Sequence, residues 1–588
     1  MNSKKITGYN TVYNLLLVLA YLRKSSRTFL VGNYLLNWLL ETRNKPYTTT
    51  LGTIKKNENL MKKLLFIISC ILLSSCSQQK ILTLITKTPK IKYQKPTNFD
   101  KLNNYQKDAV YLTELIKQTY PRLSTKITTE NYLIESNNLI EKLSKTQNDL
   151  DFEVEIQKFI SLLKDGHSYM WINYIGKDKR KFNISLYKEK KDWIIWNIDK
   201  SKDSLYIGSK IISINGKKPN EIKNLINKFE CGENEFWKLK NFGWKITYPK
   251  YLEAVGIIEK GENLILSIAK NNKTEIIKIG KKEKVTFYNI KIKKRKFPFT
   301  EKQNNGFYYK VNVEQNFAYL QMNTSLDYVS IKSEISNYTN FITKPIALAY
   351  LKKDTKNARN FGITLQSLFN EIENNNIENL IIDLRYNTGG DERPGKQLIW
   401  YLTDNKNING FTDYLNISDY FKTQIKNDYK KYNNLYKKKY NKPIPYGEIN
   451  ITKEFFNQPY FYDITKENSP FLLDNSIPKF KGKVYVLIGT NTFSAGQVLA
   501  TTIADNNLAT LVGKPTGNKP TSQTGASGFK LPNTKKIIMI SYTFMERPNK
   551  EKNGENALYP NVEIHHTYEQ IINGDDKQFE YIINEMKK

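Results

Sequence analysis

The chain has 588 residues, and 39% of them are hydrophobic. A chain of this length is too long for one core, so we expect two to four domains. Its 91 Lys and Arg against 57 Asp and Glu give a formal net charge of +34. The lysines are spread along the whole chain without an Arg-rich stripe or zinc-finger spacing, so we expect no nucleic-acid partner. The folded body holds a single thiol, Cys231, because Cys70 and Cys76 lie in an N-terminal apolar segment; this excludes an internal disulfide and a Cys₂-type metal site.

A targeting signal begins at Met61. The sequence MKKLLFIISCILLSSC places two lysines before a short apolar run, which is typical of a secretory signal rather than of a membrane span. Its last four residues, Leu73 to Cys76, resemble a bacterial lipobox, in which the Cys becomes the lipidated first residue. We therefore expect residues 61–76 to be a lipoprotein signal peptide with Cys76 as the lipid acceptor. The alternative is an ordinary signal peptide with an incidental cysteine.

Residues 1–60 would precede this signal, and we expect them to be a mis-assigned upstream segment. The alternative is an additional N-terminal membrane anchor, although the apolar run Leu15–Leu22 is short for a span. The expected location is the cell envelope, periplasmic or surface-facing, with the protein held on a bacterial membrane by its lipid.

Three domains are predicted after a polar tether over residues 77–97. Residues 98–175 should form a helical domain, because apolar residues recur at helical spacing up to Asp165-Gly166-His167. Residues 176–295 alternate apolar and polar, which predicts a β-rich, PDZ-like domain. Within it, Asn215-Gly216 after a strand predicts a hairpin.

Residues 310–588 should form a catalytic α/β domain. Short, nearly continuous apolar strands alternate there with helices, which indicates a sheet covered on both faces. The expected strands are Phe317–Met322, Leu380–Leu384, Val484–Ile488, Thr510–Val512 and Ile537–Ile540, and the expected helices are Phe361–Glu373 and Ala495–Asp505. A Tyr-, Asn- and Lys-rich insertion interrupts this pattern at about 405–475.

Two segments of this domain carry residues with possible chemistry. In the first, a buried strand runs into the turn that contains Gly389 and Gly390, where backbone amides can approach a ligand closely. In the second, a strand leads to Ser494 at the start of a helix. Ser is a favoured helix N-cap, so Ser494 has a structural explanation beside the interpretation as a nucleophile.

Taken together, the two segments resemble the catalytic domain of the tail-specific (C-terminal-processing) serine proteases. The matching motifs are Asp-Leu-Arg-x-Asn-x-Gly-Gly at 383–390 and Thr-Phe-Ser-Ala-Gly at 492–496, with a similar Gly-x-Pro-Thr loop at 513–516. This family is related to the tricorn core and the retinoid-binding photoreceptor proteins, and the resemblance covers about residues 100–565.

The resemblance implies a crotonase-like α/β core and cleavage of peptide bonds in exported proteins through an acyl-enzyme on Ser494. Gly389 or Gly390, with the amide of Ala495, would stabilise the tetrahedral intermediate. Protein or peptide substrates are expected as partners, together with the membrane through the lipid anchor. No cofactor and no metal are expected.

Two residues compete as the general base that Ser494 needs. Lys519, which we place first, lies 25 residues after Ser494, the family's usual separation, and would serve as a neutral amine after burial. His167 follows the helical domain, as the histidine base of the tricorn-like branch does, and Glu555 could orient it.

The alternative function is a catalytically inactive, lipid-anchored peptide- or ligand-binding protein on the same fold. Two departures from the family's pattern favour it: the PDZ-like segment has no clear glycine-rich carboxylate-binding loop, and Gln497 stands where many relatives carry an acid.

Overall fold

The computed structural model describes residues 86–588 except 147, 172–179, 272, 285, 291, 303–305, 339–359 and 456–458. The predicted upstream segment 1–60, the signal peptide 61–76 with Cys76, and most of the predicted tether lie outside the described residues. Within the described ranges, no helix is long and apolar enough to cross a membrane. The described residues belong to one compact unit, Ser77–Lys588.

The helical domain consists of α5 (Asn104–Thr119), α6 (Thr129–Lys142) and α7 (Asp149–Ser161). Each helix begins where a side-chain oxygen of the preceding residue accepts a backbone N–H of the first turn, which satisfies a donor that has no partner inside the helix. The apolar faces of the three helices meet in one buried cluster.

The expected tether departs from a solvated linker over residues 87–93. The Lys530 N–H donates to the Lys87 carbonyl at 3.0 Å, and the Tyr111 hydroxyl donates to the Pro89 carbonyl at 2.7 Å. Ile91 and Tyr93 pack against the helical-domain core. This stretch is therefore part of the folded body, because burial of its two large apolar side chains offsets the cost of ordering the chain.

The β-rich domain contains an antiparallel sheet of β3 (Ile184–Glu189), β4 (Asp192–Ile198), β5 (Lys210–Ile214), β6 (Leu264–Lys270) and β7 (Lys273–Ile279), in that order. A small pair, β2 (Lys181–Phe182) and β8 (Lys281–Lys282), lies beside it. The helices α8 (Pro219–Ile226), α9 (Glu235–Lys245) and α10 (Pro249–Ala254) contribute to its core.

The predicted hairpin at Asn215-Gly216 is a turn without a second strand. Both residues have positive φ, 46° and 79°, as a tight two-residue turn requires. After a single bridge between Ile214 and Lys217, the chain enters α8. β5 pairs instead with β4, which precedes it, and with β6, which begins about fifty residues later in the chain.

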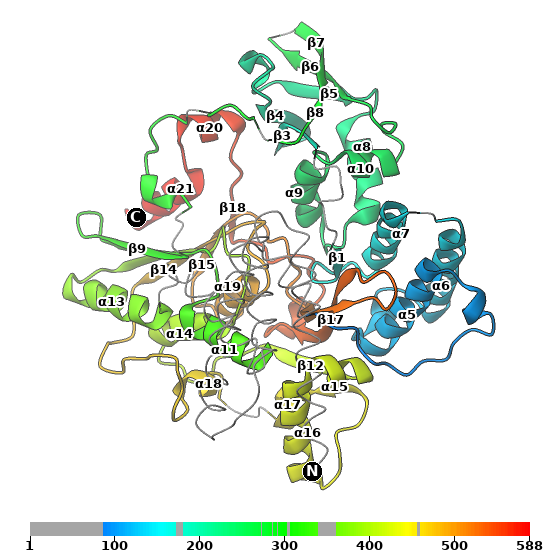
Figure 1. Ribbon diagram of the computed structural model, residues 1–588. Helices are drawn as coiled ribbons and strands as arrows, with labels where there is room; N and C mark the ends of the chain where they lie inside the picture. The colour runs from blue at the N-terminus through cyan, green and yellow to red at the C-terminus, as the bar shows by residue number, and fades with distance from the viewer. Residues whose placement is uncertain are drawn as a thin grey trace, which may run out of the picture. The chain divides into compact units, whose positions relative to one another are not determined.

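The catalytic domain is built on a sheet with the order β18-β15-β14-β11-β10-β9 (Figure 1). Its strands are β9 (Phe307–Asn312), β10 (Phe317–Met322), β11 (Asn379–Asp383), β14 (Lys483–Ile488), β15 (Thr510–Gly513) and β18 (Val562–Glu563). All neighbours are parallel except β9 with β10.

Successive residues of these strands point to opposite faces of the sheet, and both faces are buried. One face packs against α13 (Phe361–Asn374), α14 (Arg393–Leu402) and α19 (Ala495–Asp505). The other packs against α21 (Lys577–Met586). The prediction of an α/β core with helical and β-rich domains is confirmed. Because β11 and β14 are parallel neighbours, the loops that follow them meet at one edge of the sheet.

A second, antiparallel sheet joins the helical domain to the catalytic domain. It consists of β1 (Tyr169–Trp171), β12 (Thr412–Ile417), β13 (Gly447–Asn450), β16 (Ser522–Lys530) and β17 (Ile537–Glu546). The predicted strand Ile537–Ile540 is thus the start of β17 and lies outside the parallel sheet. It pairs with β1 and β16 instead, and its apolar side chains enter the helical-domain core.

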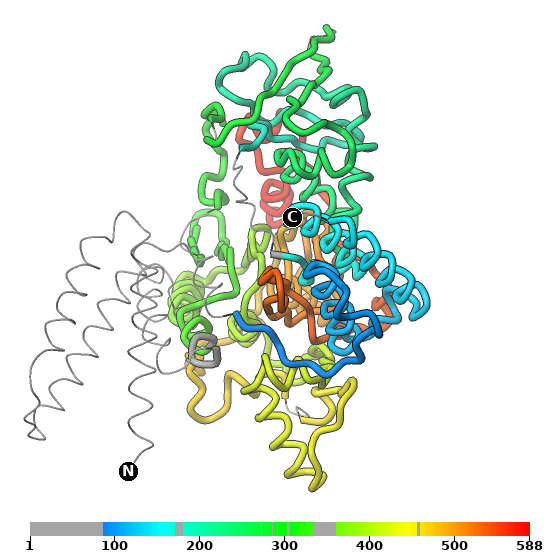
Figure 2. Tube along the Cα trace, turned by 45° about the vertical axis from the view of Figure 1, so that its right-hand side comes forward, coloured from blue at the N-terminus to red at the C-terminus, as the bar shows by residue number. Residues whose placement is uncertain are grey.

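The insertion at about 405–475 is integral to the catalytic domain, since β12 pairs with β17. Its helices are α15 (Asp419–Gln424), α16 (Lys426–Tyr440), α17 (Ile451–Phe455) and α18 (Tyr462–Thr465). The remaining helices of the described chain are α11 (Tyr328–Tyr338) and α20 (Tyr568–Asn573). Figure 2 shows the segment around α20, in red, beside the β-rich domain, where the Tyr187 hydroxyl donates to the His566 carbonyl.

Candidate active site

Ser494 precedes the first residue of α19 in an unusual backbone conformation. Its φ is 52° and its ψ is −127°, a region that costs a residue with a side chain about 1–3 kcal/mol. An N-cap serine would accept a backbone N–H from the first turn, but the Ser494 side chain makes no such bond. Its hydroxyl also has no hydrogen-bond partner among the described residues. The capping explanation therefore does not account for this serine.

The turn that carries Ser494 is fixed to the loop after β11. The Phe493 N–H donates to the Asn387 carbonyl at 2.9 Å, and the Thr492 hydroxyl donates to the Leu384 carbonyl at 2.9 Å. From a third direction, the Ser494 N–H donates to Asn518 Oδ1 at 3.0 Å. The backbone of the serine is therefore held from two neighbouring loops, which maintain its strained conformation.

Gly389 lies directly against Ser494. Its φ is 102°, and a Cβ added there would lie 2.5 Å from Ser494 Cβ, so only glycine fits. The Gly389 N–H donates to Asn387 Oδ1 at 2.9 Å and is not available to a substrate oxygen. Gly389 is therefore not one of the oxyanion donors, contrary to one of the two predicted possibilities. Its role is to let the two loops approach each other closely beside Ser494.

Gly390 and Ala495 retain free amides in the described part of the chain. In the bridge between Ser325 and Gly390, the Ser325 N–H donates to Gly389 and the Ser325 carbonyl accepts from Asp391. The Gly390 N–H is thus directed away from Ser325. The Ala495 N–H belongs to the first turn of α19, where donors have no partner inside the helix. These two amides are the remaining pair for an oxyanion.

His167 lies in a turn after α7 and packs against the residue before the serine. The centroids of the His167 and Phe493 rings are 4.8 Å apart. His167 Nδ1 is 3.7 Å from Asp165 Oδ1, and both ring nitrogens are buried without a hydrogen-bond partner in the described chain. Burial alone would lower the pKa of His167, but the Asp165 and Glu233 carboxylates raise it above its ordinary value of 6.5.

Asp165 holds this turn in place. It is fully buried, and its Oδ1 accepts a hydrogen bond from the backbone N–H of His167 at 2.9 Å. Its Oδ2 accepts from the Ser541 hydroxyl at 2.8 Å and from the Ser168 hydroxyl. Because Ser541 belongs to β17, the histidine turn is tied to the second sheet of the catalytic domain.

Glu233 completes the cluster and was missed by the sequence analysis. It belongs to the β-rich domain, 66 residues beyond His167, and no motif surrounds it. Burial and then the charge of Asp165 raise the pKa of Glu233 to about 7 from its ordinary 4.5. One possible ligand atom from each of Asp165, His167 and Glu233 lies within 4.8 Å of the other two. The Lys126 ammonium interacts with both carboxylates, so the group is better described as an acid–base network than as a metal centre.

Lys519 and Glu555 are placed differently from His167. Lys519 is half-buried, and its ammonium forms no ion pair or hydrogen bond with the residues that the structure describes. The pKa of Lys126 is lowered mainly by burial, and the positive charge of Lys519 lowers it further. Glu555 pairs with Arg547 at 2.6 Å and has no contact with His167, so it does not orient the histidine.

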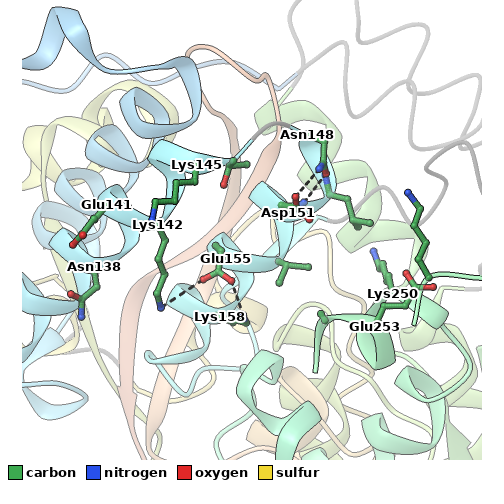
Figure 3. A pocket seen from close by; sticks show the side chains of 15 residues that line it. Asn138, Glu141, Lys142, Lys145, Asn148, Asp151, Glu155, Lys158, Lys250 and Glu253 are labelled. Atoms are coloured by element: carbon green, nitrogen blue, oxygen red, sulfur yellow. Dashed lines mark hydrogen bonds and ion pairs between the residues drawn. The ribbon is translucent and has the colours of Figure 1, made fainter. Parts of the chain in front are cut away.

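A large cavity lies apart from these residues. Its volume is about 800 Å³, and it is lined by α6, α7 and α10 (Figure 3). Lysines and acids alternate around it, and Glu155 bonds Lys158 at 2.6 Å across one wall. Neither Ser494 nor His167 lines this cavity, so it is not the catalytic cleft.

Known proteins resemble this chain in sequence over the catalytic domain and in fold. Residues 347–564 match the model of peptidase family S41, a range that includes both glycines, Ser494 and Lys519. Over these residues the chain is similar to the S41 peptidases, the tail-specific proteases. This match supports a serine peptidase over the inactive binding protein.

Solved structures have a fold similar to that of this chain. Mature CPAF in complex with lactacystin is 14% identical, with a TM-score of 0.54, 82% of this chain covered and 97% of that chain. A serine-to-alanine mutant of CPAF is 13% identical, with a TM-score of 0.55, 82% of this chain covered and 96% of that chain. At this identity the likeness concerns the fold alone. The comparison with curated proteins gave no match.

Proposed function

We propose that this chain is an S41 peptidase that cleaves exported proteins through an acyl-enzyme on Ser494, with His167 as the general base. The observation that carries the proposal is the strained, uncapped Ser494 beside the free amides of Gly390 and Ala495. In the first step His167 takes the hydroxyl proton while Oγ attacks the scissile carbonyl. The resulting oxyanion accepts hydrogen bonds from the two amides, and the N-terminal end of α19 adds its positive dipole.

The second half of the reaction uses the same groups. The His167 imidazolium gives its proton to the leaving amine, which releases the first product and leaves an ester on Ser494. A water molecule, deprotonated by His167, then attacks the ester through a second oxyanion and restores the free serine. No hydrogen bond joins His167 and Ser494 in the described chain, so we expect the imidazole and the hydroxyl to come together when a substrate binds.

His167 is favoured over Lys519 by its orientation. A catalytic base is normally oriented by a third group, and the Asp165 and Glu233 carboxylates and the Phe493 ring all lie close to His167. In the described chain, Lys519 has no carboxylate or carbonyl that fixes its ammonium. The preceding Asn518 instead contacts the Ser494 amide.

Purified variants test the assignment with unfolded casein as substrate. Ser494→Ala should abolish hydrolysis, and His167→Gln should be nearly as damaging, because nucleophile and base act as one unit. Lys519→Met is the matched control and should retain activity within about threefold, and imidazole should partly restore His167→Ala. An inactive Lys519→Met beside an active His167→Gln would assign the base to lysine.

We further propose that Cys76 is lipidated and anchors the protease in the cell envelope. The support is the signal-like segment 61–76 with its lipobox-like end. A fatty-acid analogue should label the wild-type protein but not Cys76→Ala. Cys70→Ala, in the same apolar segment, is the control and should keep the label. Label that persists in Cys76→Ala contradicts the anchor.

A further inference from the structure

The β-rich domain inserts a short segment into the active site. Residues 230–237 follow the short helix Asn227–Phe229 and include the first turn of α9. They contact the loop that contains Asn518. Asn234 donates to the carbonyls of Thr516 at 3.0 Å and Asn556 at 2.9 Å, while its own side-chain oxygen caps α9. The two N–H donors of this amide therefore join the β-rich domain to the catalytic domain, while its oxygen fixes the start of α9.

Aromatic stacking fixes the same segment from the other side. The ring of Trp237 stacks on Phe493 with 4.5 Å between centroids, and its Nε1 donates to Glu230 at 3.0 Å. Glu230 in turn pairs with the buried Lys245 at 2.7 Å. At Gly232, an added Cβ would lie 1.9 Å from the Trp237 ring, so no residue larger than glycine fits at this position. The segment is therefore rigidly placed beside the serine.

Glu233, within this segment, contacts both halves of the catalytic machinery. Its Oε1 accepts from the Gly166 N–H at 3.3 Å, in the turn that carries His167. The same oxygen accepts from Asn518 Nδ2 at 3.3 Å, and Asn518 Oδ1 accepts the Ser494 N–H. The other oxygen, Oε2, is buried and has no hydrogen-bond partner among the described residues. One carboxylate thus joins the base turn to the nucleophile turn.

We propose that Glu233 is a positioning residue that aligns His167 with Ser494 and stabilises the imidazolium that forms during the reaction. This inference rests on the proposed function, in which His167 is the base. Oε2 has no hydrogen-bond partner in the described chain, and one carboxylate oxygen of Glu233 lies within 4.8 Å of a His167 ring nitrogen. Since a carboxylate buried without a compensating partner is costly, its presence here is explained by a charge that develops in the transition state.

The pH response of His167 depends on the two carboxylates near it and on two titratable groups that interact with those carboxylates. Asp165 lies on the same turn, Glu233 comes from the β-rich domain, Lys126 follows α5, and Tyr120 ends α5 beside the two acids. Replacing Glu233 by glutamine keeps its shape and a hydrogen-bond acceptor but removes one negative charge. The pKa of His167 should then fall, since an opposite charge within about 4–6 Å stabilises the protonated form.

The test compares Glu233→Gln with Glu235→Gln in the full chain. Glu235 lies two residues later, on the surface, where it pairs with Lys223 and Lys238. For Glu233→Gln we expect kcat to fall about tenfold or more with KM unchanged, and the acid limb of kcat/KM to move to lower pH by on the order of one unit. Its Tm should stay equal or rise. Glu235→Gln should match the wild type in all four quantities.

The outcomes separate this inference from the proposed function. A wild-type kcat and pH profile in Glu233→Gln, with His167→Gln inactive, would overturn the role of Glu233 and leave the base assignment intact. A lower kcat with a lower Tm and an unmoved acid limb would reduce Glu233 to a structural residue. Activity in His167→Gln would refute the proposed base itself. If Glu233→Gln does not fold, Glu233→Asp keeps the charge while shortening the contact, and an unchanged kcat in that variant would also overturn the inference.

Discussion

Replacing Gly389 by alanine should inactivate the protease while leaving most of the fold intact. The added Cβ would lie 2.5 Å from Ser494 Cβ, 3.0 Å from the Phe493 carbonyl oxygen and 3.1 Å from the Ala495 nitrogen. Ordinary contact begins at 3.4 Å, so the Ser494 turn must move by roughly 1 Å. A displacement of that size costs about 100-fold in rate, or about 2.7 kcal/mol of transition-state stabilisation.

The control must reproduce the backbone strain without the collision. Gly261 has a φ of 97°, close to the 102° of Gly389, and an added Cβ meets nothing within 4 Å. Gly261→Ala should therefore lose about 1–2 kcal/mol of stability and keep full activity. We would measure kcat/KM on a fluorogenic peptide and unfolding in urea for both variants. A Gly389→Ala protein with more than about a third of wild-type kcat/KM would refute the close packing that this argument requires.

Three further predictions concern the acid–base network. The kcat/KM of the wild type should rise with pH through the pKa of His167, which its two carboxylate neighbours place above 6.5, and then level off; activity still rising above about pH 9 would indicate a lysine base. Glu233 has a folded-state pKa of about 7 against 4.5, so the stability that it contributes is greatest below pH 4.5 and is lost as pH rises to 7. Over those 2.5 units at about 1.36 kcal/mol each, Glu233→Gln should be more stable than the wild type at pH 8 by up to about 3 kcal/mol in urea unfolding, with no difference at pH 4; equal stability at pH 8 would contradict the burial of a charge. Asn518→Ala leaves the Ser494 N–H without its acceptor and should cost about 1–3 kcal/mol of stability together with a loss of kcat, whereas an unchanged kcat would show that the serine turn holds itself.

The four central strands of the parallel sheet could be predicted from the sequence because they are largely buried on both faces, whereas the edge strands β9 and β18 are mostly half-buried or exposed and were not predicted. The expected strand Phe317–Met322 coincides with β10, and the expected helix Ala495–Asp505 coincides with α19. A fully buried strand leaves a continuous apolar run whose ends are set by polar residues or glycine, so its bounds can be predicted from local composition.

The long-range strand pairings and the acid–base network could not be predicted from the sequence in the same way. The strand that begins at Ile537 has a similar apolar pattern. Besides the nearby β16, it pairs with β1 next to the helical domain and with β12 of the insertion, and no local pattern predicts these two partners. Glu233 stands in a polar loop of a different domain from Ser494. The only unusual residue next to it in the sequence is Gly232, where a side chain would collide with the Trp237 ring. That collision can be recognised only from the three-dimensional structure.

The catalytic machinery is distributed over three stretches of chain, around His167, Glu233 and Ser494. A polypeptide that is still being synthesised cannot hydrolyse anything until the loop with Asn518 has been made and folded against the two earlier parts. Heat should likewise stop hydrolysis before it melts the parallel sheet, because loosening the β-rich domain alone withdraws Glu233 and Trp237 from the serine. The temperature at which activity disappears would then report the least stable of the three parts, and the unfolding of the sheet would follow at a higher temperature.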